Sequence, residues 1–247
     1  MVTWRDDDSF ELGGIEYLCR PIGGRFKSEP GRFCLLKPRA EVERYEKILH
    51  DLEPRRIVEV GMYDGASAAL FAEIARPERL VTIDQRPAPT QALTDFISTR
   101  AFGGTISPYC GVDQGDAPRL REILTEAFHG QRLDFVVDDA SHLVDLTRRT
   151  FNCIFPHVRP GGTYVIEDWS WAHAAMLGPW STSDELPLTV LIFELILASA
   201  HVPAVVSSVN VSKFSAVITR GDAELDADTF DISTCYGPKG RALVADL

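Results

Sequence analysis

The sequence lacks any run of basic residues. It has 36 Asp and Glu residues against 25 Lys and Arg residues, so its formal net charge is −11 at pH 7. A surface with this charge repels the phosphate backbone of nucleic acids, and we therefore expect no nucleic-acid partner. Apolar residues make up 45% of the 247 residues and charged residues 25%. That composition is typical of a globular protein, and the length suits one α/β domain.

Cysteine is scarce. The five cysteines are Cys19, Cys34, Cys110, Cys153 and Cys235. Their number is odd and no two stand in a CxxC arrangement, which disfavours a disulfide framework and a structural zinc site. Such cysteine usage is typical of a protein in a reducing compartment, so we expect a cytoplasmic location.

Long hydrophobic runs are also missing. The longest apolar stretch, residues 186–200, is interrupted by Pro187 and Glu194, and it is too short to span a bilayer. The first eight residues include three consecutive Asp residues and no apolar stretch, unlike a signal peptide. We therefore expect no membrane partner.

What the sequence does contain, from residue 56 onward, is an alternation of short apolar runs with helical patterns. Apolar runs separated by helices predict a parallel sheet covered on both faces. The last two runs flank a tight turn at Ser212 and Lys213, which predicts an antiparallel edge. The expected fold class is α/β, a Rossmann-like doubly wound, mostly parallel seven-stranded sheet with an antiparallel edge strand. The predicted strands are residues 56–61, 80–84, 105–112, 133–137, 163–166, 204–211 and 214–219.

Three segments are expected along the chain. Residues 1–40 form an N-terminal arm, in which the pairs Gly13-Gly14 and Gly23-Gly24 suggest a hairpin. Residues 41–220 form the main domain, and residues 221–247 form a polar, acidic tail.

The first predicted strand leads into an ExGxxxG loop. Gly61 and Gly65 allow a ligand to approach the backbone closely, and the helix that follows offers free N–H groups to a carboxylate. The loop matches neither GxGxxG nor GxxxxGK[ST], which disfavours a pyrophosphate ligand. A purely structural role of the glycines in a tight turn stays open. The candidate cofactor residues of this loop are Glu59, Gly61, Tyr63, Gly65 and Ser67.

Two further strand ends fit an adenosyl cofactor. Asp84 ends the second predicted strand, where a carboxylate can accept hydrogen bonds from a ribose. Asp113 and Gln114 follow the third strand and predict an adenine-binding edge. Asp84 could instead cap a helix or lie in solvent. The order of these features along the chain favours an adenosyl cofactor.

Carboxylates end the next two predicted strands. Asp138 and Asp139 follow the fourth strand, and Glu167 and Asp168 follow the fifth. If these strands are neighbours, the carboxylates converge and repel one another unless they are protonated or bridged by a cation. Oxygen ligands of this kind suit Mg²⁺. Helix capping and a solvated loop are the alternative interpretations, and which of the two adjacent aspartates binds metal stays open.

His142 follows three residues after Asp139 and is either a surface histidine or a general base, since imidazole has an ordinary pKa of about 6.5. Trp169, Trp171 and Trp180 could close over a substrate ring or pack at a subunit contact.

Two stretches resemble a known family. VEVGMYDGAS (residues 58–67) and VDDASHLVDLTRRTFNCIFPHVRPGGTYVIEDW (residues 137–169) resemble the metal-dependent sugar O-methyltransferases of macrolide biosynthesis, with the related rhamnosyl O-methyltransferases and cephalosporin hydroxylase-like proteins. The resemblance implies S-adenosylmethionine and Mg²⁺ as cofactors, and His142 as the base. It places Asp84 on the ribose, and we assign Asp138 to the cofactor side. The implied metal ligands are Asp139, Glu167 and Asp168.

We therefore expect methyl transfer to a hydroxyl of a small-molecule acceptor, in particular a deoxysugar of a natural product, by a homo-oligomeric enzyme. A catechol-type O-methyltransferase and a non-catalytic S-adenosylmethionine-binding protein are the alternatives. An NAD(P)-linked oxidoreductase is disfavoured because GxGxxG and Tyr-x-x-x-Lys are missing.

Overall fold

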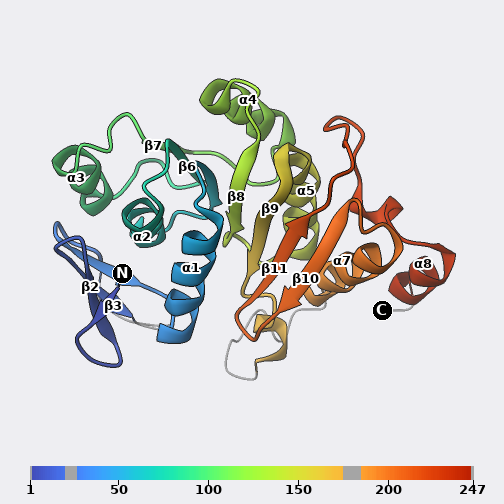
Figure 1. The fold of residues 1–247 in the computed structure, drawn as a ribbon, viewed down its shortest axis with the longest axis horizontal. Coiled ribbons are helices and arrows are strands. Elements are labelled where there is room, and N and C mark those ends of the chain that lie inside the picture. Colours follow the sequence, from blue (N-terminus) through green and yellow to red (C-terminus); the bar gives the residue numbers. More distant parts are fainter. Residues whose placement is uncertain (1, 20–26, 175–184, 246–247) are drawn as a thin grey trace. The chain divides into compact units, whose positions relative to one another are not determined.

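The computed structural model describes residues 2–19, 27–174 and 185–245 (Figure 1). The chain divides into two compact units, Met1–Val112 and Asp113–Leu247. The strands of the larger sheet are β5 (Arg56–Val60), β6 (Arg79–Asp84), β7 (Ile106–Cys110), β8 (Leu133–Asp138), β9 (Val158–Glu167), β10 (Val206–Val211) and β11 (Ser215–Arg220). Their hydrogen-bonded order is β10-β11-β9-β8-β5-β6-β7. The predicted α/β fold, with a mostly parallel seven-stranded sheet and an antiparallel edge, is confirmed.

In the first unit, β5, β6 and β7 are parallel neighbours. Their helices are α1 (Arg39–Leu52), α2 (Ala66–Ala75) and α3 (Gln91–Thr99). Pro108 lies in the middle of β7, where it pairs in register with Thr82. Proline lacks the backbone N–H that an inner strand needs for both neighbours, but β7 ends the sheet and pairs on one side only.

The first unit also contains a smaller, four-stranded sheet in the order β1-β2-β3-β4. Its strands are β1 (Thr3–Trp4), β2 (Ser9–Leu12), β3 (Ile15–Cys19) and β4 (Arg32–Leu35). The hairpin predicted at Gly13-Gly14 joins β2 to β3, and both glycines have positive φ. The other glycine pair, Gly23-Gly24, lies outside the described residues.

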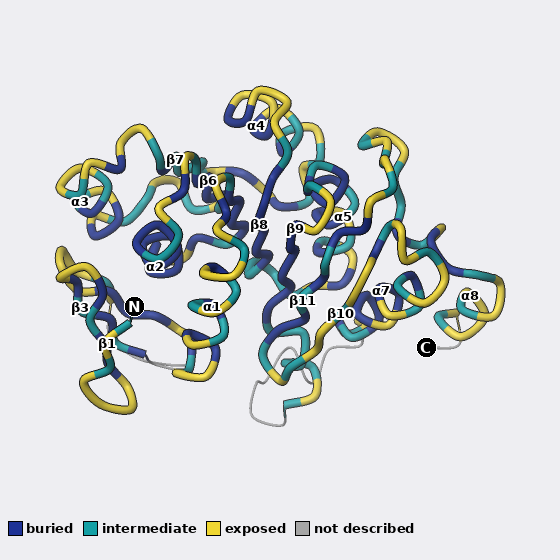
Figure 2. The backbone as a smooth tube through the Cα atoms, in the orientation of Figure 1, coloured by how far each residue is buried: buried dark blue, intermediate teal, exposed yellow. Residues whose placement is uncertain are grey.

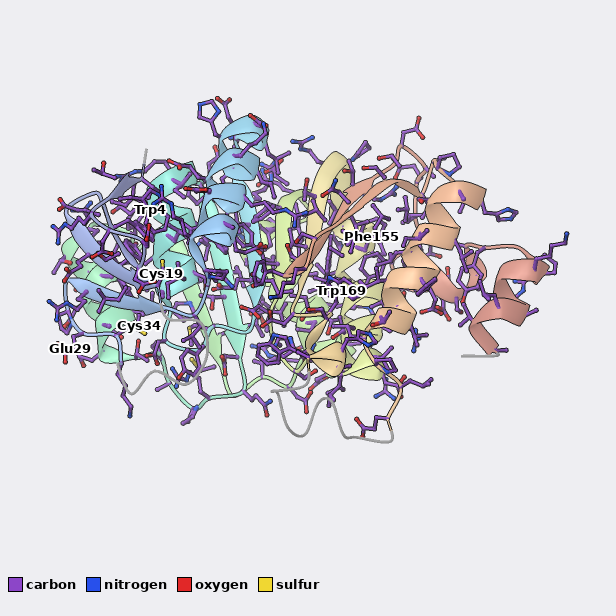
Figure 3. All side chains as sticks on the ribbon, turned by 90° about the horizontal axis from the view of Figure 1, so that it is seen from below. Trp4, Cys19, Glu29, Cys34, Phe155 and Trp169 are labelled. Carbon is purple, nitrogen blue, oxygen red and sulfur yellow. The ribbon has the colours of Figure 1, made fainter. Side chains whose placement is uncertain are left out.

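An aromatic row holds this small sheet against α3. The ring of Tyr17 stacks on Phe10 at 4.7 Å and on Phe33 at 5.7 Å, and Phe33 meets Phe96 of α3 edge-on at 5.8 Å. The cysteines labelled in Figure 3, Cys19 and Cys34, are both buried and lie on the neighbouring strands β3 and β4.

In the second unit, β8 and β9 are parallel, and β11 pairs antiparallel with both β9 and β10. Figure 2 shows β8 buried along its whole length. The α-helices are α4 (Ala117–Phe128), α5 (Val144–Ile154), α7 (Thr189–His201) and α8 (Pro238–Ala245). Short 3₁₀ turns are η1 (Phe155–His157), η2 (Trp171–His173) and η3 (Ile232–Thr234). No helix among the described residues is both long and apolar enough to cross a membrane.

The predicted turn at Ser212 and Lys213 joins β10 to β11. The Ser212 N–H donates to the Ser215 carbonyl at 2.8 Å, and the Ser212 hydroxyl accepts from the Ser215 N–H at 3.1 Å. Several element bounds differ from the sequence prediction, and the largest difference is at β9, which begins at Val158 rather than at residue 163. The apolar stretch over residues 186–200 is helical only from Thr189. Residues 221–247, predicted as a tail, include η3 and α8, and the segment boundaries stay a prediction.

Candidate functional site

The glycine loop of the first unit runs from the end of β5 to the start of α2. Gly61 and Gly65 have φ values of 96° and 82°, which side chains rarely tolerate. A Cβ at Gly65 would also lie 2.8 Å from the Cβ of Leu93. The sequence analysis left open a purely structural role for the glycines of this loop. Gly65 has such a role, because packing alone requires glycine at this position.

Asp84, at the end of β6, holds this loop. Its Oδ2 accepts hydrogen bonds from the N–H groups of Met62 and Tyr63, each at 2.9 Å, and its Oδ1 accepts from the Arg86 N–H at 2.9 Å. A carboxylate oxygen accepts about two hydrogen bonds. Both positions on Oδ2 are thus used by the loop, and Oδ1 keeps one position for a ligand.

The other predicted loop residues differ in exposure. Glu59 and Ser67 are buried, whereas Tyr63 is 57% exposed. The sequence analysis missed Arg86, whose guanidinium lies 5.9 Å from the centre of the Tyr63 ring and donates to the Tyr63 carbonyl. Arg86 has no motif of its own. Its place two residues after Asp84 was the one available signal.

Gln114 and Asp138 belong to a buried network in the second unit. The Gln114 amide donates to Asp138 Oδ1 at 3.4 Å and to the Thr150 hydroxyl at 3.1 Å, and its carbonyl accepts from the Ser141 N–H at 2.9 Å. The Tyr164 hydroxyl donates to Asp138 Oδ2 at 3.3 Å. Burial, with the nearby charge of Asp139, raises the pKa of Asp138 to about 7.

These contacts give Gln114 and Asp138 an evident structural role, because they brace the turn that follows β8. Asp113 is exposed, and its Oδ1 accepts from the Gly115 N–H at 2.7 Å. Direct contact of these three residues with a cofactor stays a prediction.

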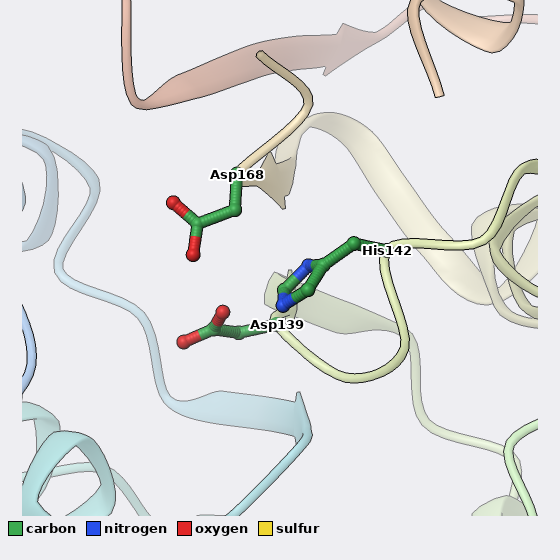
Figure 4. Close-up of side chains that lie close together, drawn as sticks. All are labelled: Asp139, His142 and Asp168. Carbon is green, nitrogen blue, oxygen red and sulfur yellow. The ribbon is translucent and has the colours of Figure 1, made fainter. Parts of the chain in front are cut away.

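Three side chains gather where β8 and β9 end (Figure 4). The potential ligand atoms of Asp139, His142 and Asp168 all lie within 4.8 Å of one another, and all three residues are half-buried. Asp139 follows β8 directly and Asp168 follows β9, and these strands are parallel neighbours. The convergence of strand ends expected from the sequence is therefore present.

Glu167 is not in this group, although it was predicted as a metal ligand. Successive strand residues point to opposite faces, and Glu167, the last residue of β9, is buried at 4% exposure. Its role as a ligand stays a prediction.

The backbone at His142 and Asp168 is unusual. Both residues have positive φ, 58° and 55°, in the left-handed region that costs a non-glycine residue about 1 kcal/mol or more. The Asp168 N–H donates to the Phe214 carbonyl at 2.7 Å, and the Asp168 carbonyl accepts from the Trp171 N–H at 3.0 Å. Such conformations persist where surrounding contacts fix them, and they are frequent at functional sites.

A cavity of about 210 Å³ adjoins this group. Trp171 packs its ring against the His142 imidazole with centroids 4.5 Å apart, and the Trp169 indole N–H donates to the Ser212 carbonyl at 2.8 Å. Trp169 and Trp171 thus line a cavity, as their suggested role beside a substrate ring requires. Trp180 lies outside the described residues. The lining residues are His142, Leu143, Asp168, Trp169, Trp171, Ala172, Glu185, Leu186, Pro187 and Leu188.

The sequence analysis missed the wall formed by residues 185–188. These residues carry no motif, and their sequence distance from His142 gives no signal of contact. Pro187, two residues before α7, was the one local indication of an irregular segment.

Comparison with known proteins agrees with this geometry. Residues 58–169 match the family model of a methyltransferase domain. This segment of the chain is therefore similar to a methyltransferase domain. The match begins in β5, before the glycine loop, and ends one residue after Asp168, so it includes the group of Asp139, His142 and Asp168.

Among curated relatives, demethylmacrocin O-methyltransferase of Streptomyces fradiae is 43% identical over 79 residues, which cover 32% of this chain and 19% of the relative. Mycinamicin VI 2''-O-methyltransferase of Micromonospora griseorubida is 50% identical over 56 residues, covering 23% of this chain and 13% of the relative. These matches span only a small part of the relatives' length. The predicted resemblance to sugar O-methyltransferases of macrolide biosynthesis is confirmed.

A solved structure of MycE methyltransferase from the mycinamycin biosynthetic pathway, in complex with Mg, SAH and mycinamycin VI, is 26% identical with a TM-score of 0.56. The similarity covers 72% of this chain and 49% of MycE. The O-methyltransferase TomG from Streptomyces achromogenes, at 18% identity and a TM-score of 0.53, shares the fold.

Proposed function

We propose that the protein transfers a methyl group from S-adenosylmethionine to a hydroxyl group of a small-molecule acceptor, namely a sugar of a natural product. One observation carries the proposal. Asp139, His142 and Asp168 converge within 4.8 Å beside a cavity, inside the segment that is similar to a methyltransferase domain. The curated relatives named as sugar O-methyltransferases support the acceptor class.

The first unit fits the cofactor. Helix α2 has Gly65 as its N-cap and no hydrogen bond from a capping side chain, so its first N–H groups can face the carboxylate of the methionine moiety. Asp84 Oδ1 keeps one acceptor position for a ribose hydroxyl. The sulfonium of S-adenosylmethionine supplies a methyl group that is already activated for transfer.

The second unit fits a divalent cation. Asp139 and Asp168 offer the carboxylate oxygens that Mg²⁺ prefers, and His142 lies beside them. A bound cation would make the acceptor hydroxyl more acidic. His142 then accepts the hydroxyl proton while Trp171, in contact with its ring, holds the imidazole in place.

The experiment is a methylation assay with a separate binding arm. S-adenosylmethionine with a deuterated methyl group is incubated with the protein, Mg²⁺ and a panel of glycosides and catechols, and products are identified by mass spectrometry. We expect deuterated methyl ethers of a glycoside, with turnover abolished by chelator and restored by Mg²⁺. Calorimetry should show binding of S-adenosylmethionine and none of NAD.

Carboxylate variants assign the metal site. Asp139→Asn and Asp168→Asn should each lower Mg²⁺ affinity and turnover, whereas Asp226→Asn, on an exposed loop, should change neither. Full turnover in excess chelator would remove the metal from the proposal. Cofactor binding without methylation of any acceptor would support a non-catalytic binding protein instead.

A further inference from the structure

Glu194 is a buried carboxylate that the proposed reaction does not use. It is the one charged residue in the apolar stretch over residues 186–200, and only 2% of it is exposed to solvent. An ionised carboxylate is costly to bury unless charged and hydrogen-bonding groups compensate it. Its place in an otherwise apolar helix therefore indicates a role that an apolar residue could not fill.

Glu194 joins three separate segments of the second unit. Its Oε2 accepts a hydrogen bond from Arg148 Nε at 2.9 Å and lies 2.9 Å from Nη2 of the same guanidinium. Its Oε1 accepts from the Tyr236 hydroxyl at 2.7 Å. Arg148 belongs to α5, Glu194 to α7, and Tyr236 to the segment between η3 and α8. Both carboxylate oxygens are thus used to connect these segments.

The two helices that this cluster joins begin at the cavity beside His142. The N-cap residues of α5 and α7 are Leu143 and Leu188, and both line the cavity. The two helices contact each other (Figure 1). Arg148 lies about one turn into α5, and Glu194 lies about one and a half turns into α7. The bond between these side chains therefore sets the spacing of two parts of the cavity wall.

The start of α7 is also connected to the aromatic part of the wall. The Trp171 ring packs against the His142 imidazole with centroids 4.5 Å apart. His173, in the same 3₁₀ turn as Trp171, shares a hydrogen bond through its Nε2 with the hydroxyl of Thr189, the first residue of α7. The placement of Trp171 against His142 therefore depends on where α7 lies relative to α5.

The segment that carries Tyr236 is itself fixed on α5. The Asn152 side chain accepts from the Ile232 N–H at 3.0 Å and donates to Asp231 Oδ1 at 3.1 Å. Tyr236 is 4% exposed, and its hydroxyl reaches Glu194 of α7. The C-terminal segment therefore holds both helices from the side away from their N-caps.

We propose that Glu194 is a positioning residue that, held by Arg148 and Tyr236, sets the width of the cavity beside His142. The proposal rests on the proposed function only in placing the acceptor in this cavity. Replacing a buried ion pair by well-packed apolar residues is often neutral or stabilising. The cluster therefore contributes a defined geometry more than it contributes stability.

A triple variant separates geometry from stability. Arg148→Met, Glu194→Leu and Tyr236→Phe together remove the cluster without leaving a buried charge, so we expect a folded protein with a melting temperature near the parental value. Protein labelled with 5-fluorotryptophan is followed by fluorine NMR without any ligand, and Trp171→Phe identifies the resonance of Trp171. We expect this resonance to move or broaden in the triple variant.

Steady-state kinetics with the acceptor found in the methylation assay give the second measurement. The kcat/KM for the acceptor should fall about ten- to a hundred-fold in the triple variant, because small displacements of reacting groups slow a reaction strongly. The KM for S-adenosylmethionine should change by less than about two-fold, since Asp84 and the glycine loop belong to the first unit. The matched control is Arg119→Met, which removes an exposed arginine paired with Glu122 on α4 and should keep the parental resonance and kinetics.

An unchanged Trp171 resonance in the triple variant, or a parental kcat/KM for the acceptor, would overturn the proposal. If the triple variant does not fold, Tyr236→Phe alone decides: the same resonance should change by a smaller amount, and no change would overturn the proposal. If the resonance changes but the parent methylates no acceptor, the positioning role stands and the proposed function fails. If the parent methylates an acceptor but the resonance is unchanged, the reverse applies.

Discussion

The two units build their candidate sites by different means. In Met1–Val112, Asp84 accepts three hydrogen bonds from backbone N–H groups, and the loop has positive φ at Gly61 and Gly65 as well as at Tyr63. In Asp113–Leu247, His142 and Asp168 have positive φ, and both residues line a cavity. Backbone groups thus form most of the candidate site in the first unit, whereas side chains form the candidate site in the second unit.

This difference predicts different consequences of substitution. Changes in the first unit should disturb the loop itself and therefore stability and cofactor binding together. Changes to the side chains around the cavity should reduce the reaction and leave the fold nearly intact, because these residues are only half-buried. The predictions below test this contrast, from the largest effect to the smallest.

His142→Ala should have the largest effect. Loss of a general base lowers kcat by roughly 10²–10⁴. Affinity for S-adenosylmethionine and the melting temperature should stay close to parental values, since the contacts of Asp84 and the glycine loop are unchanged. Steady-state kinetics, calorimetry and thermal unfolding measure the three quantities.

The control is His50→Ala, at an exposed position on α1, which should behave as the parent in all three measurements. A His142→Ala enzyme with near-parental kcat would show that the imidazole is not the base, and His173, whose ring lies 6.3 Å from that of Trp169, would be the next residue to test.

Gly65→Ala should mainly destabilise the fold. Its φ of 82° and the 2.8 Å approach to Leu93 both oppose a side chain. A left-handed backbone costs a residue about 1–2 kcal/mol, and an overlap in a packed region about 1–3 kcal/mol. We expect the free energy of unfolding to fall by about 2–5 kcal/mol in denaturant titrations.

Gly104→Ala is the matched control, because an added Cβ there meets no atom within 4 Å. Equal stability of the two variants would mean that the loop adapts to a side chain at Gly65, and the contrast between a backbone-built and a side-chain-built site would weaken.

Asp84→Ala should lower affinity for S-adenosylmethionine and stability together. It leaves the N–H groups of Met62 and Tyr63 without their acceptor, at a cost of about 1–3 kcal/mol. Asp84→Asn should recover most of the loss, because an amide oxygen can accept both of these bonds. If Asp84→Ala weakened binding without any change in unfolding, the carboxylate would act on the ligand alone.

The sequence predicts the sheet well because its main signals are local. Buried strands are continuous apolar runs, and Asp139 and Asp168 follow such runs directly. Proline disfavours an inner strand, but Pro108 lies in the edge strand β7, and edge position depends on the topology. The parallel pairing of β3 with β4 depends on contacts between short strands far apart in sequence, which local patterns do not encode.

The sequence predicted that carboxylates and a histidine would gather at the strand ends, but it did not predict which carboxylates belong to the group. The sequence pattern predicted both Glu167 and Asp168 as metal ligands. Asp168, however, follows β9 with a left-handed backbone, so its side chain no longer follows the alternation of side chains along the strand. A backbone turn of this type is set by tertiary contacts, here the bond to the Phe214 carbonyl at 2.7 Å. The cavity wall at residues 185–188 depends on tertiary contacts in the same way.

The smallest expected effect concerns a histidine away from the cavity, at the other end of β9. His157 precedes β9 and borders a small cavity of about 80 Å³ with Leu124, Phe128 and Leu133. Its Nε2 is buried without a hydrogen-bond partner among the described residues. Burial lowers the pKa of His157, and the charges of Arg132 and Arg121 lower it further against the opposing effect of Asp228.

The sign of the pH dependence follows from proton binding. An unfolded histidine takes up a proton near pH 6.5, whereas folded His157 does so only at lower pH, so between these values the unfolded state binds more protons. The stability contribution is full above about pH 6.5 and is lost as the pH falls. His157→Leu, apolar like its cavity neighbours, should therefore flatten the decline in melting temperature between pH 7.5 and 5. The exposed His50→Leu should keep the parental slope, and an identical slope in His157→Leu would show that His157 does not contribute to it.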